Sequence, residues 1–562
     1  MRIRHLIVAI CLSGLCGAVT PEVRLQLRVR MRDGIVLRAN LFRPPGEGKF
    51  PTILVRTPYG KGTAISTGYQ AFVDHGYAVL AQDVRGRYDS AGEFDAWHQE
   101  GPDGNDTIDW IARQSWSNGN VGMIGGSYVG IAQWQAALEN NPHLKAIFPV
   151  VSGSDDYRDR FYSTGGAMKL GHRISWIADN LHPPTFTVPP FLNLIWHLPL
   201  ATSDMAASGK VSVNFYQPAI AHPSYDAFWK ALSVREHLDK LRIPVFSVGG
   251  WYDNYAQSDL EAFAALRSAS KTAYTVIGPW PHNMSVPFEG VDFGPNSTFP
   301  VLEVQLAWFD HWLKSGKEFR RAPLKIFVMG ANNWRDEREW PLKRAKITPY
   351  YFSSKGYANT VFGNGEMTHH APLRDSFDKF TYDPLKPVQT TGGAVCCNPA
   401  IFPWGPLDQR PVEQRKDVLV YTSQLLKKEL EVTGSIQVQL YVSTSATDTD
   451  FTAKLVDVFP DGMARNLTDG ILRLRYRNGL EKPVLAVPGE VYPITIDAGV
   501  TSNVFLPGHR IRVEISSSNF PRFDRNLNTG RAQAAETEVR QAQQIVHHSR
   551  KRPSHILLPV IP

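Results

Sequence analysis

One serine lies in a sequence setting that could make its hydroxyl a nucleophile. Residues 121–130 read Val-Gly-Met-Ile-Gly-Gly-Ser-Tyr-Val-Gly, so that an apolar run and two glycines lead to Ser127. A strand, a tight corner and a helix in that order raise one hydroxyl at the end of a parallel sheet, and we expect the helix over about residues 131–140. The usual Gly-x-Ser-x-Gly pattern would place its second glycine at Val129, whereas here Gly130 follows and allows the helix to pack closely. An ordinary glycine–serine turn is the alternative.

Two later residues could activate this hydroxyl, which is a weak nucleophile unless a base takes its proton and a carboxylate orients the base. Asp253 ends the string Gly-Gly-Trp-Tyr-Asp after one apolar run, and His282 ends Gly-Pro-Trp-Pro-His after the next. Serine, aspartate and histidine in this chain order, each after a buried strand, are typical of the α/β-hydrolase triad. We therefore predict that Ser127, Asp253 and His282 act together. A turn aspartate and a solvated loop histidine are the alternative for the last two.

The charge that develops on an attacked carbonyl oxygen needs preorganised hydrogen-bond donors. The backbone N–H of Tyr128 directly follows the candidate nucleophile. A second donor usually comes from the loop after an early strand, which here reads Arg-Thr-Pro-Tyr-Gly at residues 56–60. We predict that the phenolic O–H of Tyr59 supplies it, and a turn aromatic after Pro58 is the alternative.

The first 18 residues are typical of a signal peptide. Arg2, Arg4 and His5 precede an apolar run at residues 6–15, and small residues up to Ala18 offer a cleavage site. The apolar run is short for a bilayer span. We expect export to the periplasm or the medium, with an uncleaved anchor as the alternative.

Composition and charge favour a soluble globular protein of two or three domains, without a nucleic-acid or membrane partner. The 562 residues carry a formal net charge of +7, and the basic residues are scattered along the chain. The sequence contains neither a phosphate-binding glycine loop nor zinc-type spacing of histidine and cysteine, so we expect no metal and no cofactor. Beyond the signal peptide only Cys396 and Cys397 remain. We expect two buried thiols there, with a vicinal disulfide as the alternative.

Short apolar runs separated by helical stretches predict a parallel sheet covered by helices. A predicted hairpin at residues 23–42 comes first, and the runs follow at residues 52–55, 77–81, 121–124, 146–151, 245–248 and 274–277. Residues 152–240 break this rhythm with many tryptophans, phenylalanines and prolines. We expect an α/β-hydrolase domain at residues 19–151 and 241–323, interrupted by a helical cap at residues 152–240.

Residues 324–562 contain β-type runs without intervening helices. These runs lie at residues 324–329, 418–421, 435–442, 453–459, 471–476, 491–496 and 510–516. Such a pattern predicts a β-sandwich or jelly-roll domain. Proline and glycine between residues 382 and 406 predict a long surface excursion that could cross between domains.

Taken together, these motifs resemble the cocaine esterase / X-Pro dipeptidyl peptidase family, which also contains α-amino-acid ester hydrolases and glutaryl cephalosporin acylases. The matching strings are Gly-Gly-Ser-Tyr-Val-Gly130, Arg-Thr-Pro-Tyr59, Gly-Trp-Tyr-Asp253, Gly-Pro-Trp-Pro-His282, Asp83-Val-Arg-Gly-Arg-Tyr-Asp-Ser-Ala-Gly92, Asp417-Val-Leu-Val-Tyr-Thr422, Leu506-Pro-Gly-His-Arg510 and Ser516-Ser-Ser-Asn-Phe-Pro-Arg-Phe-Asp-Arg525. The resemblance covers nearly the whole mature chain. It implies an α/β-hydrolase domain with an inserted helical cap and a C-terminal jelly roll of the galactose-binding-like type. It also implies Ser127, Asp253 and His282 as the triad, and Tyr59 with Tyr128 as the oxyanion hole.

Two positions bear on the substrate. In the α-amino-acid ester hydrolases, carboxylates two and three residues after the triad aspartate help to bind the substrate ammonium, whereas this chain has Tyr255 and Ala256. An aromatic residue at 255 is similar to the cocaine esterases, where it faces an aromatic acyl group, and Gln70 stands where those enzymes have a polar pocket residue. We expect both to contact substrate, with ordinary packing as the alternative. A carboxylate could still come from the start of the cap, at Asp155, Asp156 and Asp159.

The sequence therefore predicts an exported serine hydrolase that cleaves a carboxylic ester of a small molecule through an acyl-enzyme. A dipeptidyl peptidase or an acylase that cleaves amide bonds is the alternative among enzymes. An inactive hydrolase scaffold with a glycan-binding jelly roll is the alternative from another class. The sequence leaves a homo-oligomer open.

Overall fold

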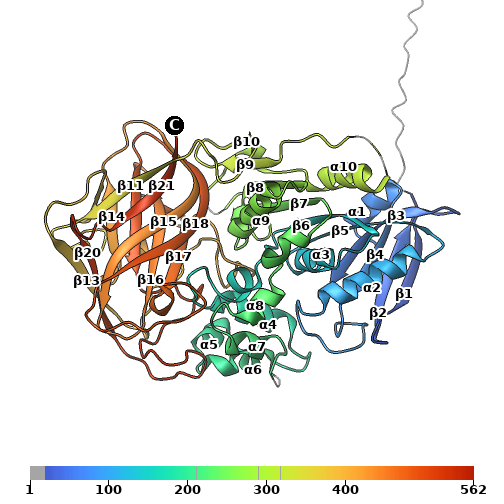
Figure 1. The fold of residues 1–562 in the computed structure, drawn as a ribbon, viewed down its shortest axis with the longest axis horizontal. Helices are drawn as coiled ribbons and strands as arrows, with labels where there is room; N and C mark the ends of the chain where they lie inside the picture. Colours follow the sequence, from blue (N-terminus) through green and yellow to red (C-terminus); the bar gives the residue numbers. More distant parts are fainter. Residues whose placement is uncertain (1–18, 210–211, 289, 315, 317) are drawn as a thin grey trace, which may run out of the picture.

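The computed structural model describes residues 19–209, 212–288, 290–314, 316 and 318–562. An α/β unit, a helical insertion (residues 152–240) and a β domain (residues 346–562) lie side by side, from right to left in Figure 1 with the insertion below the centre. The predicted signal peptide lies outside the described residues. Within them, no helix combines the length and the apolar character that crossing a membrane requires.

The α/β unit is built on one sheet, which has ten strands in the described part of the chain, in the order β1-β2-β4-β3-β5-β6-β7-β8-β9-β10. The strands are β1 (Glu22–Arg30), β2 (Val36–Arg43), β3 (Phe50–Thr57), β4 (Ala78–Asp83), β5 (Ser117–Gly126), β6 (Leu144–Val150), β7 (Val245–Tyr252), β8 (Ala273–Pro281), β9 (Leu324–Val328) and β10 (Asn333–Glu337). Neighbours from β4 through β9 run parallel, and β1, β2 and β10 are antiparallel to their neighbours. The predicted hairpin and the six predicted parallel strands are confirmed.

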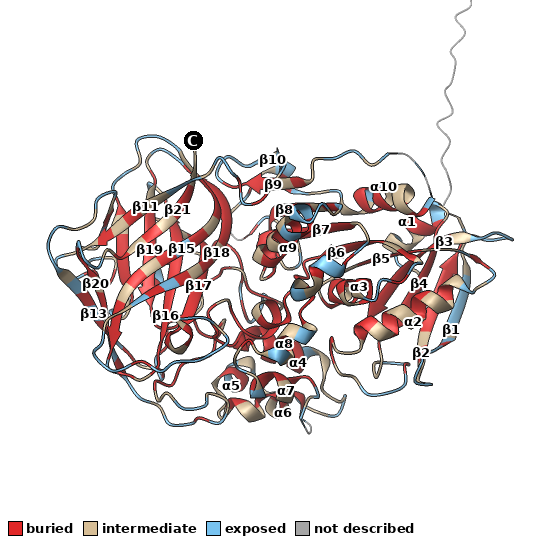
Figure 2. Cartoon of the chain, in the orientation of Figure 1, coloured by how far each residue is buried: buried red, intermediate tan, exposed pale blue. Residues whose placement is uncertain are grey.

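Helices cover both faces of this sheet, which is why its central strands are buried almost throughout (Figure 2). The helices are α1 (Thr67–Asp74), α2 (Glu100–Ala112), α3 (Tyr128–Leu138), α9 (Ala256–Ser268) and α10 (Val301–Lys314). The apolar side chains of α2, α3 and α9 join one hydrophobic cluster, and those of α1 and α10 join another. The α/β unit therefore has a three-layer core.

The helical insertion leaves the sheet after β6 and returns at β7. Its elements are η1 (Asp156–Phe161), α4 (Leu170–Asn180), α5 (Phe191–Trp196), η2 (Leu200–Thr202), α6 (Ser203–Ser208), α7 (Tyr216–Ala221), α8 (Ala227–Leu232) and η3 (Val234–Lys240). Its many aromatic side chains form a separate hydrophobic cluster, which also takes in Tyr128 of α3 and Phe520 of the β domain. The hydrophobic core of the insertion therefore packs against both the α/β unit and the β domain.

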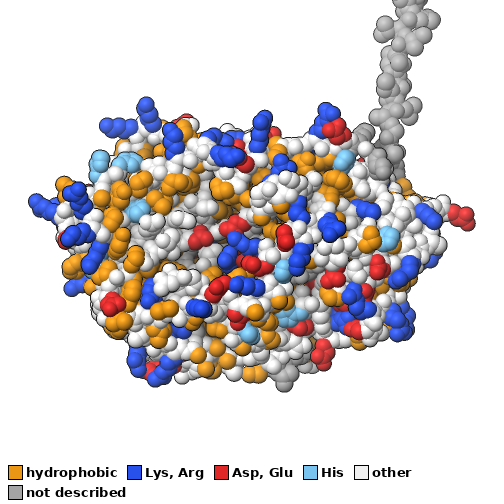
Figure 3. All heavy atoms as spheres, in the orientation of Figure 1, with side chains coloured by type: hydrophobic (Ala, Val, Ile, Leu, Met, Phe, Trp, Pro, Cys, Tyr) orange, Lys and Arg blue, Asp and Glu red, His pale blue; other side chains and the backbone are white. Residues whose placement is uncertain are grey.

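The β domain is a second sheet, with eleven strands in the described residues, in the order β13-β20-β15-β21-β11-β12-β14-β19-β16-β17, with β18 paired to β15. The strands are β11 (Lys346–Ser353), β12 (Glu366–Thr368), β13 (Ser376–Tyr382), β14 (Leu419–Ser423), β15 (Leu430–Thr444), β16 (Asp450–Val458), β17 (Ala464–Arg473), β18 (Tyr492–Phe505), β19 (Arg510–Ser516), β20 (Ala542–His548) and β21 (His555–Ile561), with the short helices α11 (Arg410–Glu413) and η5 (Leu474–Tyr476). On the face in Figure 3, basic and acidic side chains are interspersed over all three parts.

Two predictions about this region are wrong. The run at residues 324–329, assigned to the β domain, is β9 of the first sheet, where it pairs in parallel with β8. The helix α10 connects these strands, so the chain completes one more strand–helix–strand crossover before it leaves the α/β unit. Cys396 and Cys397 are joined as a disulfide rather than left as two thiols.

The excursion predicted between residues 382 and 406 does cross between domains, but much of it is buried. Residues 383–407 are called the arm below. Val388, Val395 and Cys396 are among its buried residues. The backbone of Gly393 and that of Gly405 exchange hydrogen bonds of 2.8 and 3.0 Å, which closes the arm into a loop. At Gly405 an added Cβ would lie 2.4 Å from the Phe288 ring of the α/β unit.

Close packing around the serine corner depends on two glycines. A Cβ on Gly125, whose φ is +136°, would lie 2.2 Å from Val129 Cγ1, and a Cβ on Gly130 would lie 2.6 Å from Ser152 Cβ. Val129 stands where the usual motif has its second glycine, and its side chain fits there because Gly125 has no Cβ. The expected role of Gly130 in helix packing is confirmed.

We predict that Gly130→Ala lowers the free energy of unfolding by about 1–3 kcal/mol, because the new methyl group must displace Ser152 or the helix. The measurement is the apparent melting temperature by circular dichroism. Gly68→Ala on α1 is the matched control, since its Cβ would meet nothing closer than 4.0 Å, and it should not lower stability. Adding Ser152→Gly to Gly130→Ala should recover part of the loss. Equal stability of Gly130→Ala and the unmodified chain would contradict the packing argument.

Candidate active site

Ser127 stands at the corner between β5 and α3 in a backbone conformation that serine rarely adopts. Its φ is 54° and its ψ is −125°. Its N–H donates to the carbonyl oxygen of Val150 at 2.9 Å, and its own carbonyl oxygen accepts from the N–H of Gly130 and Ile131. A positive φ on a residue with a Cβ costs of the order of 1–3 kcal/mol and persists only where the surroundings enforce it. The corner thus has the strained geometry that the sequence pattern predicts.

Asp253 and His282 meet at the ends of two neighbouring strands. Asp253 directly follows β7, His282 directly follows β8, and His282 Nδ1 lies 2.6 Å from Asp253 Oδ2. The other carboxylate oxygen of Asp253 accepts the backbone N–H of Tyr255 at 3.0 Å, so both oxygens are held in place. Because Nδ1 is engaged by the carboxylate, Nε2 is the ring nitrogen left for proton transfer.

Tyr59 brings its hydroxyl to Ser127. The hydroxyl accepts from Trp176 Nε1 at 3.1 Å. Although the residue as a whole keeps 38% of its surface exposed, burial of the hydroxyl raises its pKa above the usual value for tyrosine, and the neighbouring Trp176 and Ser127 side chains lower it by less. Tyr59 therefore stays protonated, and the bond from Trp176 leaves its own O–H free to donate.

The second expected donor, the N–H of Tyr128, belongs to the first residue of α3. The first N–H groups of a helix have no partner within that helix and point along its axis, where they stabilise negative charge. This amide and the Tyr59 hydroxyl therefore flank Ser127 from two different elements. Such a pair could receive an oxyanion that forms at a carbonyl bound to the serine.

A buried ion pair holds the Tyr128 side chain, and with it the start of α3. The Tyr128 hydroxyl donates to Glu100 Oε1 at 2.8 Å, and Arg56 Nη1 lies 2.6 Å from Glu100 Oε2. Burial raises the pKa of Glu100, and the Arg56 charge opposes that shift. Sequence reasoning did not identify Glu100, which lies on α2 and shares no motif with the serine.

Aromatic rings of the helical insertion form a wall beside this corner. Trp176 of α4 stacks on Tyr128, with ring centroids 6.1 Å apart and planes 4° from parallel. Phe215 of the insertion and Trp97 of the α/β unit continue the wall, with ring centroids 4.8 Å apart, and the Arg173 guanidinium lies over the Trp97 ring. Sequence reasoning noted the aromatic richness of residues 152–240 but not which rings would reach the serine.

The two expected substrate contacts have different surroundings. Tyr255 is buried, and its ring centroid lies 5.7 Å from that of His282 and 6.3 Å from that of His172. Gln70 lies on α1, where its amide donates to the Val19 carbonyl and to Asp74 Oδ1, both at 2.7 Å. Among the described residues, the hydrogen bonds of Gln70 lead to the N-terminal segment and not to His282, because Asp74 is one helical turn away and takes up the amide.

The three aspartates at the start of the insertion are already engaged by this chain. Asp155 caps η1 by accepting from the N–H of Tyr157 and Arg158, and Asp156 pairs with Arg160 at 2.7 Å. Asp159 Oδ2 accepts from the N–H groups of Ser154 and Asp155 at 3.0 and 2.8 Å. Each carboxylate therefore has a partner within the insertion.

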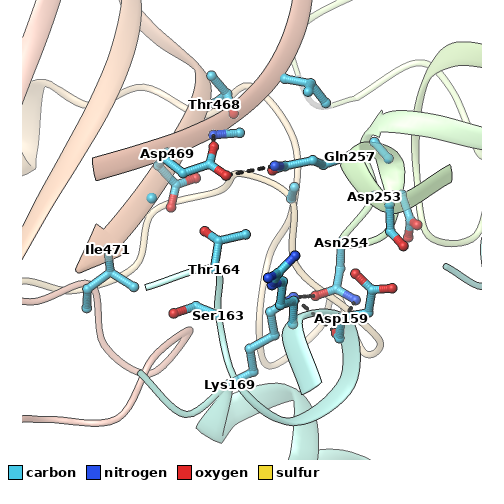
Figure 4. A pocket seen from close by; sticks show the side chains of 18 of the residues that line it. Asp159, Ser163, Thr164, Lys169, Asp253, Asn254, Gln257, Thr468, Asp469 and Ile471 are labelled. Atoms are coloured by element: carbon cyan, nitrogen blue, oxygen red, sulfur yellow. Dashed lines mark hydrogen bonds between the residues drawn. The ribbon is translucent and has the colours of Figure 1, made fainter. Parts of the chain in front are cut away.

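A small polar cavity lies behind Asp253, at the junction of all three parts of the molecule. Figure 4 shows Asp159, Lys169 and Asn254 converging there, opposite Thr468 and Asp469 of the β domain. Lys169 Nζ donates to Asn254 Oδ1 at 2.8 Å and to the Asp159 carbonyl at 3.0 Å. Burial lowers the pKa of Lys169 to about 7 and raises that of Asp159 to about 6. The hydrogen bonds of Lys169 therefore join the loop after Asp253 to the start of the insertion.

We predict that Tyr59→Phe lowers kcat for an aryl ester by about 100- to 1,000-fold, because it removes one donor to the oxyanion. KM should change little, since the ring remains. The matched control is Tyr357→Phe in the β domain, a half-exposed tyrosine, which should leave kcat unchanged. A kcat of Tyr59→Phe within about threefold of the unmodified chain would rule out this role for the hydroxyl.

The chain matches two protein-family models. Residues 33–284 match the X-Pro dipeptidyl-peptidase (S15 family), and residues 317–557 match the X-Pro dipeptidyl-peptidase C-terminal non-catalytic domain. The S15 match ends two residues after His282, so it includes all three of the expected triad residues.

Individual proteins are similar over the whole length. Cocaine esterase of Rhodococcus sp. (strain MB1 Bresler) is 40% identical over 569 residues, which cover 96% of this chain and 99% of that protein. A solved aminopeptidase from the marine sediment archaeon Thaumarchaeota archaeon superposes with a TM-score of 0.83 at 26% identity, covering 100% of this chain and 99% of that one. A solved α-amino acid ester hydrolase superposes with a TM-score of 0.85 at 25% identity, covering 99% and 98%. The chain therefore belongs to the cocaine esterase / X-Pro dipeptidyl peptidase family, and it is a serine hydrolase.

Proposed function

We propose that this chain is an exported esterase that cleaves carboxylic esters with a neutral acyl group by way of an acyl-enzyme. Ser127 Oγ attacks the ester carbonyl while His282 Nε2 takes its proton. Asp253 keeps the imidazole in the tautomer with its proton on Nδ1. The Tyr59 hydroxyl and the Tyr128 N–H stabilise the oxyanion.

The second half of the reaction uses the same groups. His282 gives its proton to the alkoxide leaving group, which departs as the alcohol and leaves the acyl group on Ser127 Oγ. Water then loses a proton to His282 and attacks the acyl-enzyme. The second tetrahedral intermediate collapses to release the acid, and the proton returns to Ser127.

One observation carries the preference for a neutral acyl group. Where the α-amino-acid ester hydrolases have carboxylates, this chain places the uncharged ring of Tyr255, buried against His282. The carboxylates at the start of the helical insertion have partners of their own, as described above. A substrate ammonium group bound here would lose its hydrating water molecules without gaining an unpaired carboxylate as its partner. Similarity to cocaine esterase supports the same preference.

We also infer that the helical insertion acts as a cap over the site and that the β domain is a jelly roll. Support for the cap comes from Trp176, which contacts both Tyr59 and Tyr128. Support for the jelly roll comes from β17 and β18, which lie in contact although they are far apart along the sheet path. Export rests on the composition of the first 18 residues.

The test compares the purified protein with Ser127→Ala on a neutral aryl ester, an α-amino acyl ester and a dipeptidyl anilide. We expect the highest kcat/KM for the neutral ester, and a loss of about 10,000-fold or more in kcat in the variant, because a triad member is missing. Ser268→Ala, which alters an exposed serine at the end of α9, is the matched control and should retain full activity.

Each other outcome has a definite meaning. A preference for the anilide would favour a dipeptidyl peptidase. The matching S15 family model is named for that activity, and one of the similar solved structures is an aminopeptidase. A preference for the α-amino acyl ester would contradict the argument from Tyr255. Full activity of Ser127→Ala would exclude Ser127 as the nucleophile.

A further inference from the structure

Three atoms that can ligate a metal ion lie together where the arm meets the helical insertion. A ring nitrogen of His172 and the sulfur atoms of Cys396 and Cys397 all lie within 4.8 Å of one another. His172 keeps only 6% of its surface exposed and Cys396 none. The two sulfurs are joined as a disulfide in this structure. Because His172 and the cysteines are far apart in the chain, their sequence spacing gives no zinc motif.

His172 supplies a second, independent observation. Its Nδ1 is buried and has no hydrogen-bond partner among the described residues. A buried polar atom in that condition costs about 1–3 kcal/mol, and native structures rarely keep one without a reason. A cation bound at Nδ1 would take the lone pair of this otherwise unpartnered nitrogen.

The backbone around these side chains is firmly held. Gly171 donates its N–H to the Pro521 carbonyl at 2.7 Å, and a Cβ on Gly171 would lie 2.8 Å from that carbonyl oxygen and 3.1 Å from the Phe402 ring of the arm. A larger residue at position 171 would therefore have to displace the backbone at Pro521, and the arm rests directly on α4 beside His172. Paired backbone bonds between Gly393 and Gly405 close the arm just around the cysteines.

The cluster borders the candidate triad. The His172 ring contacts the Tyr255 ring, and the Tyr255 ring contacts that of His282. Trp176, one turn after His172 on α4, donates to the Tyr59 hydroxyl. A change at Cys396 or Cys397 is thus two ring contacts from the group that would move the proton.

We propose that Cys396, Cys397 and His172, once the disulfide is reduced, form a binding site for a thiophilic divalent cation, Zn²⁺, beside the triad. Two thiolates and one imidazole are donors that Zn²⁺ prefers, and three protein ligands leave a fourth position for water. The site is separate from the ester chemistry, which needs no metal.

Reduction frees both sulfurs before the cation binds. A phosphine reductant attacks the disulfide, the S–S bond breaks, and the phosphorus takes an oxygen atom from water to become the phosphine oxide. The two hydrogen atoms of that water end on the two sulfurs as thiols. Zn²⁺ then replaces both thiol protons and accepts the lone pair of one His172 nitrogen, so that binding releases two protons to solvent.

Binding has a consequence for turnover, which rests on the proposed function. A cation and its water at His172 would occupy space beside Tyr255 and repel positive charge that forms on the His282 imidazole. Zn²⁺ should therefore inhibit ester hydrolysis by the reduced protein and not by the oxidised protein. A chelator should restore the activity.

The experiment titrates the full chain, with Cys11→Ser and Cys16→Ser so that Cys396 and Cys397 are its only cysteines. Co²⁺ serves as a spectroscopic probe and Zn²⁺ competes for its place. After phosphine reduction we expect one Co²⁺ per chain, with a thiolate-to-cobalt charge-transfer band and the visible bands of a tetrahedral site, all abolished by Zn²⁺. The oxidised chain should show neither the charge-transfer band nor the visible bands.

Two variants and one control identify the ligands. Cys396→Ser with Cys397→Ser should lose the charge-transfer band. His172→Ala should weaken Zn²⁺ binding by about 100-fold or more, since removing only a supporting residue of a ligand already costs 10- to 100-fold. His182→Ala, a histidine of the same insertion that bonds the Pro183 carbonyl, should bind as the unmodified chain does.

Any one of three outcomes would overturn the proposal. The reduced chain could lack the charge-transfer band, the oxidised and reduced chains could bind Co²⁺ equally, or His172→Ala could keep the Zn²⁺ affinity of the unmodified chain. If the cysteine variant does not fold, as judged by circular dichroism, comparing Co²⁺ binding by the oxidised and reduced forms of the same chain still tests whether the two sulfurs are ligands. The Ser127→Ala chain should bind Zn²⁺ normally, so failure of the esterase proposal and failure of the metal site are separable.

Discussion

The whole site depends on holding Ser127 at a positive φ. That conformation is unfavourable for any residue with a Cβ, so the structure must enforce it from every side. Gly125 and Gly130 admit helix α3 close to β5 and β6, and the buried ion pair under the Tyr128 hydroxyl fixes the first residue of the helix. The same contacts that strain the serine aim the Tyr128 amide beside it. The strain at Ser127 and the position of the candidate oxyanion donor are therefore two results of one packing arrangement.

The α/β unit alone does not complete the surroundings of that serine. Trp176 reaches the Tyr59 hydroxyl from the helical insertion, and the arm places its cysteines against His172. The cavity behind Asp253 is lined by all three parts. The candidate triad and oxyanion donors all lie in the α/β unit, whereas the insertion and the β domain contribute side chains that surround them. This division agrees with a family whose members differ in the bond they cleave.

The outline of the fold could be predicted because parallel strands buried on both faces are continuous apolar runs, and the triad candidates stand directly after such runs. Strands β11, β13 and β20 escaped prediction, since half-exposed strands alternate polar and apolar residues and give a weaker signal. The strand β9 was assigned to the wrong sheet because an apolar run does not indicate its partner. Contacts such as those of Glu100 and His172 depend on tertiary packing alone. The role of Gln70, carried over by resemblance, stays a prediction, and its side chain bonds Asp74 and the Val19 carbonyl.

The seam between the β domain and the helical insertion limits how this molecule can be recombined. Met168 and Asp524 exchange hydrogen bonds at the start of α4, where Arg473 also pairs with Asp524. Gly171 is fitted to Phe402 within a few tenths of an ångström. A chimera that takes the β domain from a relative would break these contacts unless the insertion came with it. Residues 152–240 and the β domain would therefore have to be exchanged together, although strands of the first sheet lie between them in the sequence.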